Sequence, residues 1–113
     1  MDLKRRIAIK LKTSRKARQL TQEDLASLIG RSVDAVSNIE RAKGLPSLDT
    51  LEAIATKLEI PIAEFFEHPR GRIKLTARRF EALARLSELG RGLSDRSLEI
   101  AIKQLEALRE GSG

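Results

Sequence analysis

The fold of this 113-residue chain is decided by residues 20–47, which read LTQEDLASLIGRSVDAVSNIERAKGLPS. Thr21 is followed by a glutamine and two acids, an order that is typical of a helix N-terminus. Gly30 ends the apolar pattern that follows, as glycine does at many helix C-termini. The stretch therefore begins with a predicted helix, whose buried side is expected to consist of Leu25, Ala26, Leu28 and Ile29.

A second helix is predicted directly after Gly30. Ser32 is a favourable N-cap, Val36 and Ile39 repeat at helical spacing, and the segment AKGLP at 42–46 breaks the pattern. Two helices joined by a short turn that contains glycine form a helix-turn-helix, in which the second helix can lie in the DNA major groove. Many helix pairs bind nothing, so this spacing alone gives only a hypothesis of DNA binding.

Three further helices are predicted around this pair. The first covers about residues 3–18, and its apolar stripe consists of Leu3, Ile7 and Leu11. Another begins after Ser47, and its apolar residues recur at spacings of three and four: Leu48, Leu51, Ile54, Ala55 and Leu58. Pro61 lies in the first turn of a short helix that ends around residues 65–67. No segment alternates like a strand, so the predicted fold class is all-α.

A break in the pattern at His68–Gly71 predicts a boundary between a domain of residues 1–68 and an extension of residues 69–113. The extension is predicted to be a helical hairpin. Its first helix covers residues 76–89, the segment Gly90-Arg91-Gly92 turns the chain, and Ser94 caps the second helix.

Composition excludes several classes of function. The chain has no cysteine and one histidine, which excludes a disulfide framework, a thiolate zinc site and an all-histidine metal site. No apolar run approaches the roughly 20 residues that span a bilayer, and the first residues lack a signal-peptide pattern. His68 stands alone, no phosphate-binding loop is present, and the carboxylates are scattered. We therefore expect a cytoplasmic protein that has no catalytic residues, metal, cofactor or membrane partner.

The basic charge is concentrated at the two ends of the chain. Residues 1–20 carry a net charge of +7, residues 21–67 carry −5, and residues 68–113 carry +4. A basic segment that leads into a folded domain is typical of proteins that bind nucleic acid. The alternative is that these charges only solvate a helix face.

Residues from about 5 to 67, over half the chain, resemble the helix-turn-helix domain of phage Cro and C1 repressors, the XRE family. The resemblance rests on several features together: LTQE at 20–23, Leu-Ala at 25–26, Gly30, Ile-Glu-Arg at 39–41, Pro-Ser at 46–47 and Phe-Phe at 65–66. It implies a five-helix lambda-repressor-like domain that binds double-stranded DNA. The protein is then a transcriptional regulator, and a dimeric repressor that reads an inverted-repeat operator through its third helix is the leading hypothesis.

The third helix carries the residues that the resemblance assigns to base reading. These residues lie off the core stripe of Val36 and Ile39 and are therefore expected to face outward: Ser32, Val33, Asp34, Ser37 and Asn38. Asn38 can bind adenine through its amide, and Val33 can contact a thymine methyl. The family often has glutamines at 33 and 34, so Asp34 is a departure. Asp34 either accepts from a cytosine amino group or only supplies negative charge at a helix N-terminus.

The phosphate contacts implied by the resemblance lie at the ends of the helix pair. Gln22 begins the second helix, where an amide donor suits an anion. Arg41 and Lys43 match the loop after the third helix that holds phosphate, and Arg31 in the turn is well placed to help. Arg15 and Glu40 match a structural pair of the family, in which an arginine of the first helix binds a glutamate of the third.

The two helices of the extension need a partner, because a short hairpin buries little by itself. The dimer contact is expected to consist of Phe80, Leu83, Leu98, Ala101, Ile102, Leu105 and Leu108. The first alternative is that these helices cap the core of the same chain. The second is that the protein is an antitoxin, which binds a toxin through the C-terminal helices and also binds its own promoter.

Overall fold

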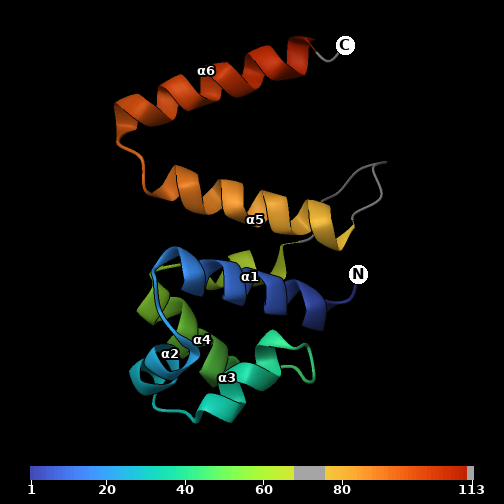
Figure 1. Ribbon diagram of the computed structural model, residues 1–113, viewed down its shortest axis with the longest axis vertical. Coiled ribbons are helices and arrows are strands. Elements are labelled where there is room, and N and C mark those ends of the chain that lie inside the picture. The colour runs from blue at the N-terminus through green and yellow to red at the C-terminus, as the bar shows by residue number, and fades with distance from the viewer. Residues whose placement is uncertain (68–75, 112–113) are drawn as a thin grey trace.

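The computed structural model describes residues 1–67 and 76–111, and over these ranges every regular element is a helix (Figure 1). The predicted boundary at His68–Gly71 lies outside the described residues. The all-α fold class is confirmed. The elements are α1 (Leu3–Ala17), α2 (Gln22–Ile29), α3 (Val33–Glu40), α4 (Leu48–Leu58), the 3-10 helix η1 (Ile62–Phe66), α5 (Ala77–Arg91) and α6 (Asp95–Gly111).

Side-chain caps start the helices where the sequence predicts them. The hydroxyl oxygens of Ser32 and Ser47 accept hydrogen bonds from the amides of Ala35 and Thr50, each at 3.1 Å. Thr21 forms a capping box, since its hydroxyl accepts from the Asp24 amide and the Asp24 carboxylate accepts from the Thr21 amide. These bonds satisfy helix N–H groups that have no partner within the helix.

The core lies between α1, α2, α3, α4 and η1, below α5 in Figure 1. Its fully buried side chains include Leu11, Leu25, Val36, Ile54 and Phe65. These aliphatic residues and a single phenylalanine fill the domain that carries the helix-turn-helix.

Leu28 was expected in this core, but the structure shows it 45% exposed. Leu25, Ala26 and Ile29 share the buried face of α2. Leu28 precedes Ile29 by one residue and therefore points about 100° around the helix from it. The prediction for Leu28 was wrong because the three buried residues span about 100° of the helix surface and Leu28 points roughly 60° beyond the edge of that span.

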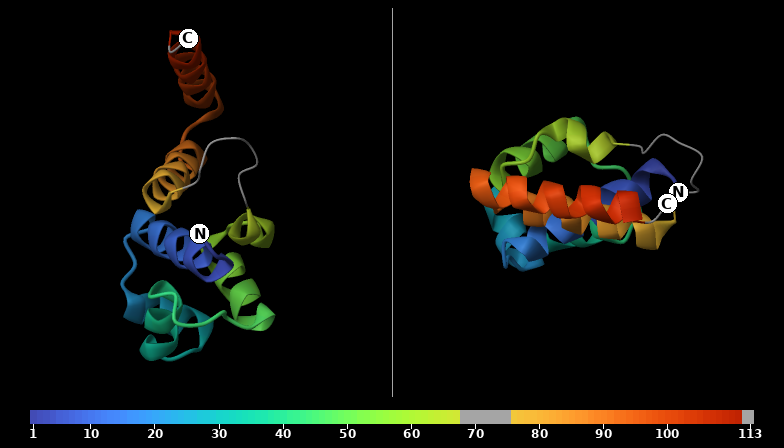
Figure 2. Two further views of the ribbon diagram at one scale, coloured as in Figure 1. Left: turned by 90° about the vertical axis from the view of Figure 1, so that its right-hand side faces the viewer. Right: turned by 90° about the horizontal axis from the view of Figure 1, so that it is seen from above.

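α5 packs along α1 on the side away from α3 (Figures 1 and 2). It was expected to end at Leu89, but it continues through Gly90 to Arg91. The guanidinium of Arg91 is bound by Glu64 of η1 and by Glu88 of its own helix, which holds this last turn in place. The short helix after Pro61 also differs from the prediction. It is a 3-10 helix, and Pro61 lies at its N-cap and not in its first turn.

Phe80 is 6% exposed within the single chain. It was expected on a surface that contacts a second subunit. Because α5 packs on α1, Phe80 is covered by its own chain and belongs to the intramolecular contact. Within one chain, α5 therefore covers α1 through Phe80, and a role of Phe80 in a dimer contact stays a prediction.

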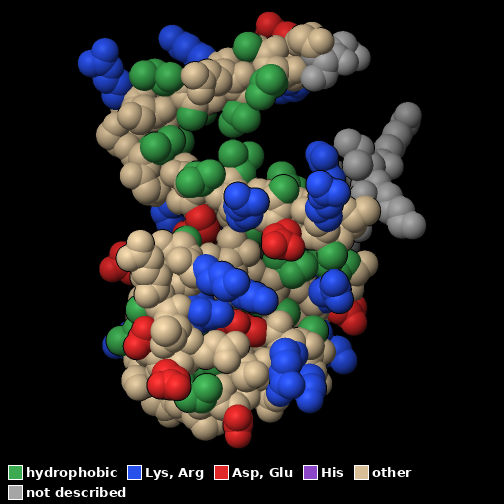
Figure 3. Space-filling view, viewed as in Figure 1, with side chains coloured by type: hydrophobic (Ala, Val, Ile, Leu, Met, Phe, Trp, Pro, Cys, Tyr) green, Lys and Arg blue, Asp and Glu red, His purple; other side chains and the backbone are tan. Residues whose placement is uncertain are grey.

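α6 extends away from the rest of the molecule, as Figure 2 shows. None of its described residues is buried. In Figure 3, apolar side chains of α5 and α6 face one another across an open hollow. Within the described residues, no helix is both long enough and apolar enough to cross a membrane.

Candidate nucleic-acid interface

The turn between α2 and α3 places the third helix on the surface. Gly30 adopts the left-handed conformation at φ 67°, and the Arg31 amide donates to the Ala26 carbonyl at 3.0 Å. A residue with a Cβ is strained in this conformation, so glycine suits the position. The chain reverses here in a tight turn, and Ser32 at once starts α3.

The exposed side of α3 carries the residues that were assigned to base reading. Ser32, Asp34 and Asn38 are exposed, Ser37 is half-buried, and Val33 is 39% exposed. Val36 and Ile39 are buried on the opposite side of the helix. The structure therefore brings these polar and small side chains together on one outward face, which is what a helix in a DNA groove requires.

Arg15 and Glu40 form a two-point ion pair beneath this face. Arg15 Nε lies 2.7 Å from Glu40 Oε2, and Arg15 Nη2 lies 2.9 Å from Oε1. The side chain of Glu40 is only 2% exposed and that of Arg15 only 9%. Hydrogen bonding to Glu40 raises the pKa of Arg15 above its ordinary value. The pair fixes the end of α3 against α1 in a defined orientation.

Gln22 completes this cluster from the start of α2. Its Nε2 donates to Glu40 Oε1 at 3.1 Å, and Arg15 Nη1 donates to the Leu20 carbonyl at 2.7 Å. One carboxylate therefore joins α1, α2 and α3. In this arrangement the Gln22 side chain binds Glu40. Gln22 is also the first residue of α2, and the phosphate contact was predicted from this position.

The other predicted phosphate contacts differ in their surroundings. Arg31 folds back onto its turn, where Nη1 donates to the carbonyls of Ile29 and Gly30 and Nε donates to Thr50 Oγ1 at 3.4 Å. Arg41 Nη2 donates to Asn38 Oδ1 at 2.9 Å, so a predicted phosphate contact and a predicted base contact are joined. Lys43 is exposed in the loop beyond α3.

A second polar network, which the sequence analysis did not find, joins α1, η1 and α5. Glu88 accepts from Ser14 at 2.9 Å and from Arg18 at 2.8 Å, and its side chain is 7% exposed. Lys10 is buried and lies 3.2 Å from Glu64, which also binds Arg91. Lys10 and Ser14 lie four residues apart beside the apolar stripe of α1. This spacing is the one feature of the sequence that indicates a polar partner on that side of the helix.

The charges in this network shift one another's pKa. Burial by itself raises the pKa of Glu64, but hydrogen bonds from Arg91 and Lys10 outweigh it, and the pKa lies below its ordinary value. Burial lowers the pKa of Arg91, but the bonds to Glu64 reverse this and raise it. Glu64 and Arg91 are therefore both charged at neutral pH, and their ion pair ties α5 to η1.

The remaining residues of the predicted dimer contact lie on exposed surfaces of α5 and α6. Leu83 is 38% exposed, and the α6 residues Leu98, Ile102, Leu105 and Leu108 are 38 to 67% exposed. Ala101 is half-buried. No group of three or more His, Asp or Glu suited to a metal ion occurs among residues 1–67 and 76–111.

The chain matches a known family and a known phage protein. A family model described as Helix-turn-helix matches residues 11–65, which include α2, α3 and the buried Arg15–Glu40 pair. An immunity repressor protein of Bacillus phage phi105 is 32% identical to this chain, and the match covers 89% of this chain and 78% of the phage protein. The second match therefore extends beyond the helix-turn-helix and into the C-terminal helices.

Proposed function

Because this chain belongs to the helix-turn-helix family of the Cro/C1 (XRE) type, we propose that it is a sequence-specific transcriptional repressor that reads operator DNA with α3. The observation that carries the proposal is the contrast between the two sides of α3. One side is fixed by the buried ion pair of Arg15 and Glu40, and the other exposes polar side chains. A rigid helix with an open polar face is suited to reading base edges. Similarity to a protein named an immunity repressor favours repression over activation.

Individual roles follow from the surroundings of each side chain. Asn38 reads a base with its amide, Val33 contacts a thymine methyl, and Ser32 and Ser37 offer hydroxyls to bases or phosphates. Arg41 supports Asn38 and also reaches the backbone, since its guanidinium has more donors than the one bond to Asn38 uses.

The peripheral contacts are made to the phosphate backbone of the DNA. Lys43 binds phosphate from the loop, and Gln22 does so from the start of α2. Arg31 must leave its bonds to the turn to bind phosphate, so its contribution is smaller than that of Lys43.

The proposal is tested by selecting bound duplexes from random DNA with the full-length chain. We expect enrichment of one motif, and binding of that motif at least a thousandfold tighter than binding of a scrambled duplex at the same salt concentration. The control is the variant Asn38→Ala, which should keep its nonspecific binding but lose part of the preference. Failure to enrich any motif would refute sequence-specific recognition.

We further propose that the repressor is a homodimer joined through the apolar faces of α5 and α6. α6 has 17 residues and no buried residue, although it carries an apolar stripe at helical spacing. In proteins most of a helix's stability comes from packing of its apolar face, so α6 requires a partner that covers the stripe. A second copy is the partner that a DNA-binding monomer needs, because two-fold symmetry doubles the site that it reads.

This dimer predicts the form of the operator. Two copies of α3 would lie about 34 Å apart, one turn of duplex, and the operator would be an inverted repeat with half-sites about 10 base pairs apart or a multiple of that. The selected motif shows directly whether such a repeat is present. A single unrepeated half-site would contradict the dimeric mode of binding.

The oligomeric state tests the interface itself. We expect sedimentation of the full-length chain to give the mass of a dimer at micromolar concentration, and Leu105→Glu to give a monomer. The matched control is Ile100→Glu, since Ile100 is also exposed but lies on the other side of α6. Circular dichroism shows whether either variant has lost helix. A monomeric wild-type chain would refute the dimer.

A further inference from the structure

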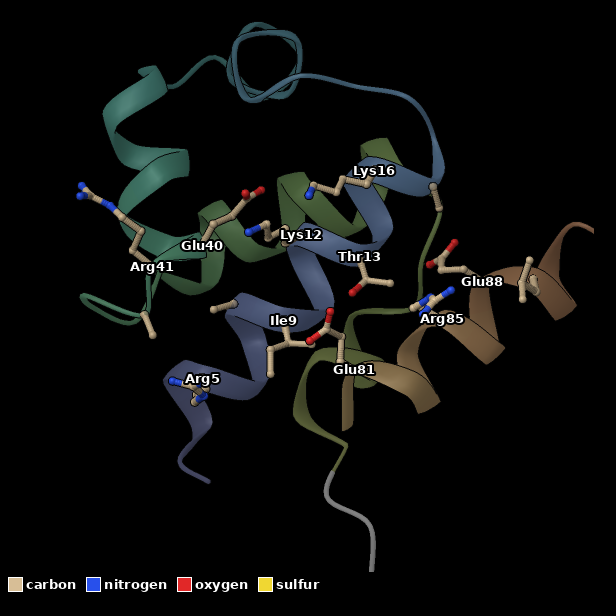
Figure 4. Close-up of a pocket in the computed structure, with 14 residues that line it drawn as sticks. Arg5, Ile9, Lys12, Thr13, Lys16, Glu40, Arg41, Glu81, Arg85 and Glu88 are labelled. Atoms are coloured by element: carbon tan, nitrogen blue, oxygen red, sulfur yellow. The ribbon is translucent and has the colours of Figure 1, made fainter. Parts of the chain in front are cut away.

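A groove of about 750 Å³ lies between α1 and α5 and reaches the end of α3. Its basic lining residues are Arg5, Lys12 and Lys16 of α1, Arg41 beyond α3, and Arg85 of α5. All five are exposed. Figure 4 shows Lys12 and Lys16 on the part of α1 nearest Glu40, and Glu81 and Arg85 entering from α5. Neither the helix-turn-helix nor the contact between α1 and α5 gives the other four basic residues, Arg5, Lys12, Lys16 and Arg85, a role.

Acidic residues in the groove do not balance this charge. Glu40 and Glu88 line it as well, but each is almost fully buried and already bound by arginines that do not line the groove. Arg15 binds Glu40, and Arg18 and Arg91 bind Glu88. Glu81 is the remaining acid among the lining residues. The groove therefore presents an excess of positive charge to solvent, and such a surface attracts anions.

The spacing of the basic residues on α1 suits an extended anion. Residues 5, 12 and 16 lie on one side of the helix, and a rise of 1.5 Å per residue places the ends of this stripe roughly 16 Å apart. Each strand of B-DNA carries one phosphate per about 3.4 Å of helix axis. The stripe can therefore follow several successive phosphates of one strand, whereas a small anion would use only part of it.

The groove is continuous with the face of α3. Arg41 lines the groove and also binds Asn38 on the exposed side of α3. A duplex that holds α3 in its major groove therefore passes Arg41 and continues towards Lys12 and Lys16. In Figure 3 the basic side chains form a band over the domain and α5 on this side of the molecule.

We infer that this groove is a second DNA-binding surface, which holds the sugar-phosphate backbone that adjoins the half-site read by α3. The inference rests on the proposed function and extends it. Lys12 and Lys16 make the principal contacts, and Arg85 brings the C-terminal extension into the DNA-binding surface. The α1–α5 contact then has a role beyond stability, since it builds one wall of the groove.

The test combines a double variant with two duplexes. Lys12→Gln with Lys16→Gln is made in the full-length chain, and binding is measured against salt concentration on the selected operator with long flanks and on one cut at the edges of the half-sites. On the long duplex we expect the log–log salt slope to fall in magnitude by about 1.8, or about 0.9 for each lost phosphate contact. The wild-type chain should bind the long duplex at least tenfold more tightly than the short one, and the variant should lose most of this difference.

A control variant separates the groove from general charge effects. Lys57→Gln with Lys103→Gln removes the same charge from exposed positions on α4 and α6 that do not line the groove. This control should keep the wild-type dependence on duplex length and a salt slope close to that of the wild type. Circular dichroism verifies that both variants keep their helices.

Three outcomes would overturn the inference. If the groove variant matches the control in both readouts while operator preference persists, the groove does not bind DNA and the proposed function stands. If the groove variant loses the same slope on both duplexes, the lysines bind within the half-site and not beside it. If the wild-type chain has no operator preference, the proposed function fails, and the inference fails with it.

Discussion

Replacing Glu40 with alanine should destabilise the fold by about 3 kcal/mol. The substitution removes a carboxylate that is 2% exposed and that accepts two hydrogen bonds from Arg15 and one from Gln22. Breaking a buried ion pair from one side costs about 3 to 5 kcal/mol, because the other charge stays buried without its partner. Arg15 keeps its bond to the Leu20 carbonyl, and the Gln22 side chain is only half-buried, which places the expected loss at the lower end of this range.

Urea unfolding followed by circular dichroism measures this loss. For a slope of about 1.5 kcal/mol per molar urea, a loss of 3 kcal/mol lowers the midpoint by about 2 M. Glu52→Ala is the matched control, since Glu52 is exposed on α4 and its removal should change stability by no more than about 0.5 kcal/mol. Arg15→Met combined with Glu40→Met should recover most of the loss, because two apolar side chains of similar length leave no buried charge.

The reasoning is refuted if Glu40→Ala and Glu52→Ala have the same midpoint. It is also refuted if the double methionine variant is less stable than Glu40→Ala. The first result would show that Arg15 reaches solvent at little cost, and the second would show that the pair contributes more than the avoidance of a lone buried charge.

Three further predictions concern the DNA-binding face and the α5 contact. Asn38→Ala should weaken operator binding by about 1 to 3 kcal/mol and relax preference at one base position, and an equal loss on scrambled DNA would show that Asn38 reads no base. Lys43→Ala should weaken binding evenly across sequences and lower the salt slope by about one; an unchanged slope would remove it from the phosphate contacts. The lowered pKa of Glu64 stabilises the fold at pH values above the ordinary glutamate pKa of 4.5, and this stabilisation is lost as the pH falls through the folded pKa. Glu64→Gln should therefore unfold with a weaker pH dependence between about pH 5 and pH 3, and identical acid transitions would contradict this.

The sequence by itself determined where the helices of the DNA-binding domain begin. Thr21, Ser32 and Ser47 each bind an amide three residues later, and such a bond depends only on the local chain. The turn at Gly30 was predictable for the same reason, since a left-handed residue is needed there. Helical spacing also identified Val36 and Ile39 as buried, which left the outward face of α3 as the candidate site.

Family resemblance added what local chemistry could not. Arg15 and Glu40 are 25 residues apart, and neither the charge pattern nor the helical spacing selects one partner for Glu40 among the basic residues of α1. The matching positions in related repressors identified the pair. The two-point geometry and the third bond from Gln22 are properties of the folded chain.

Only the tertiary structure decided how the C-terminal extension relates to the domain. The apolar stripe of α5 suited a second subunit as well as its own chain, and the burial of Phe80 shows that the helix packs on α1. The register of that contact is set by bonds between residues as far as 74 positions apart, such as Ser14 to Glu88. The basic residues of α1 were visible in the sequence, but they line a groove only because α5 builds its opposite wall. Capping and helical spacing act within a few residues and can be read along the chain, whereas the meeting of two surfaces depends on all the contacts that form between them.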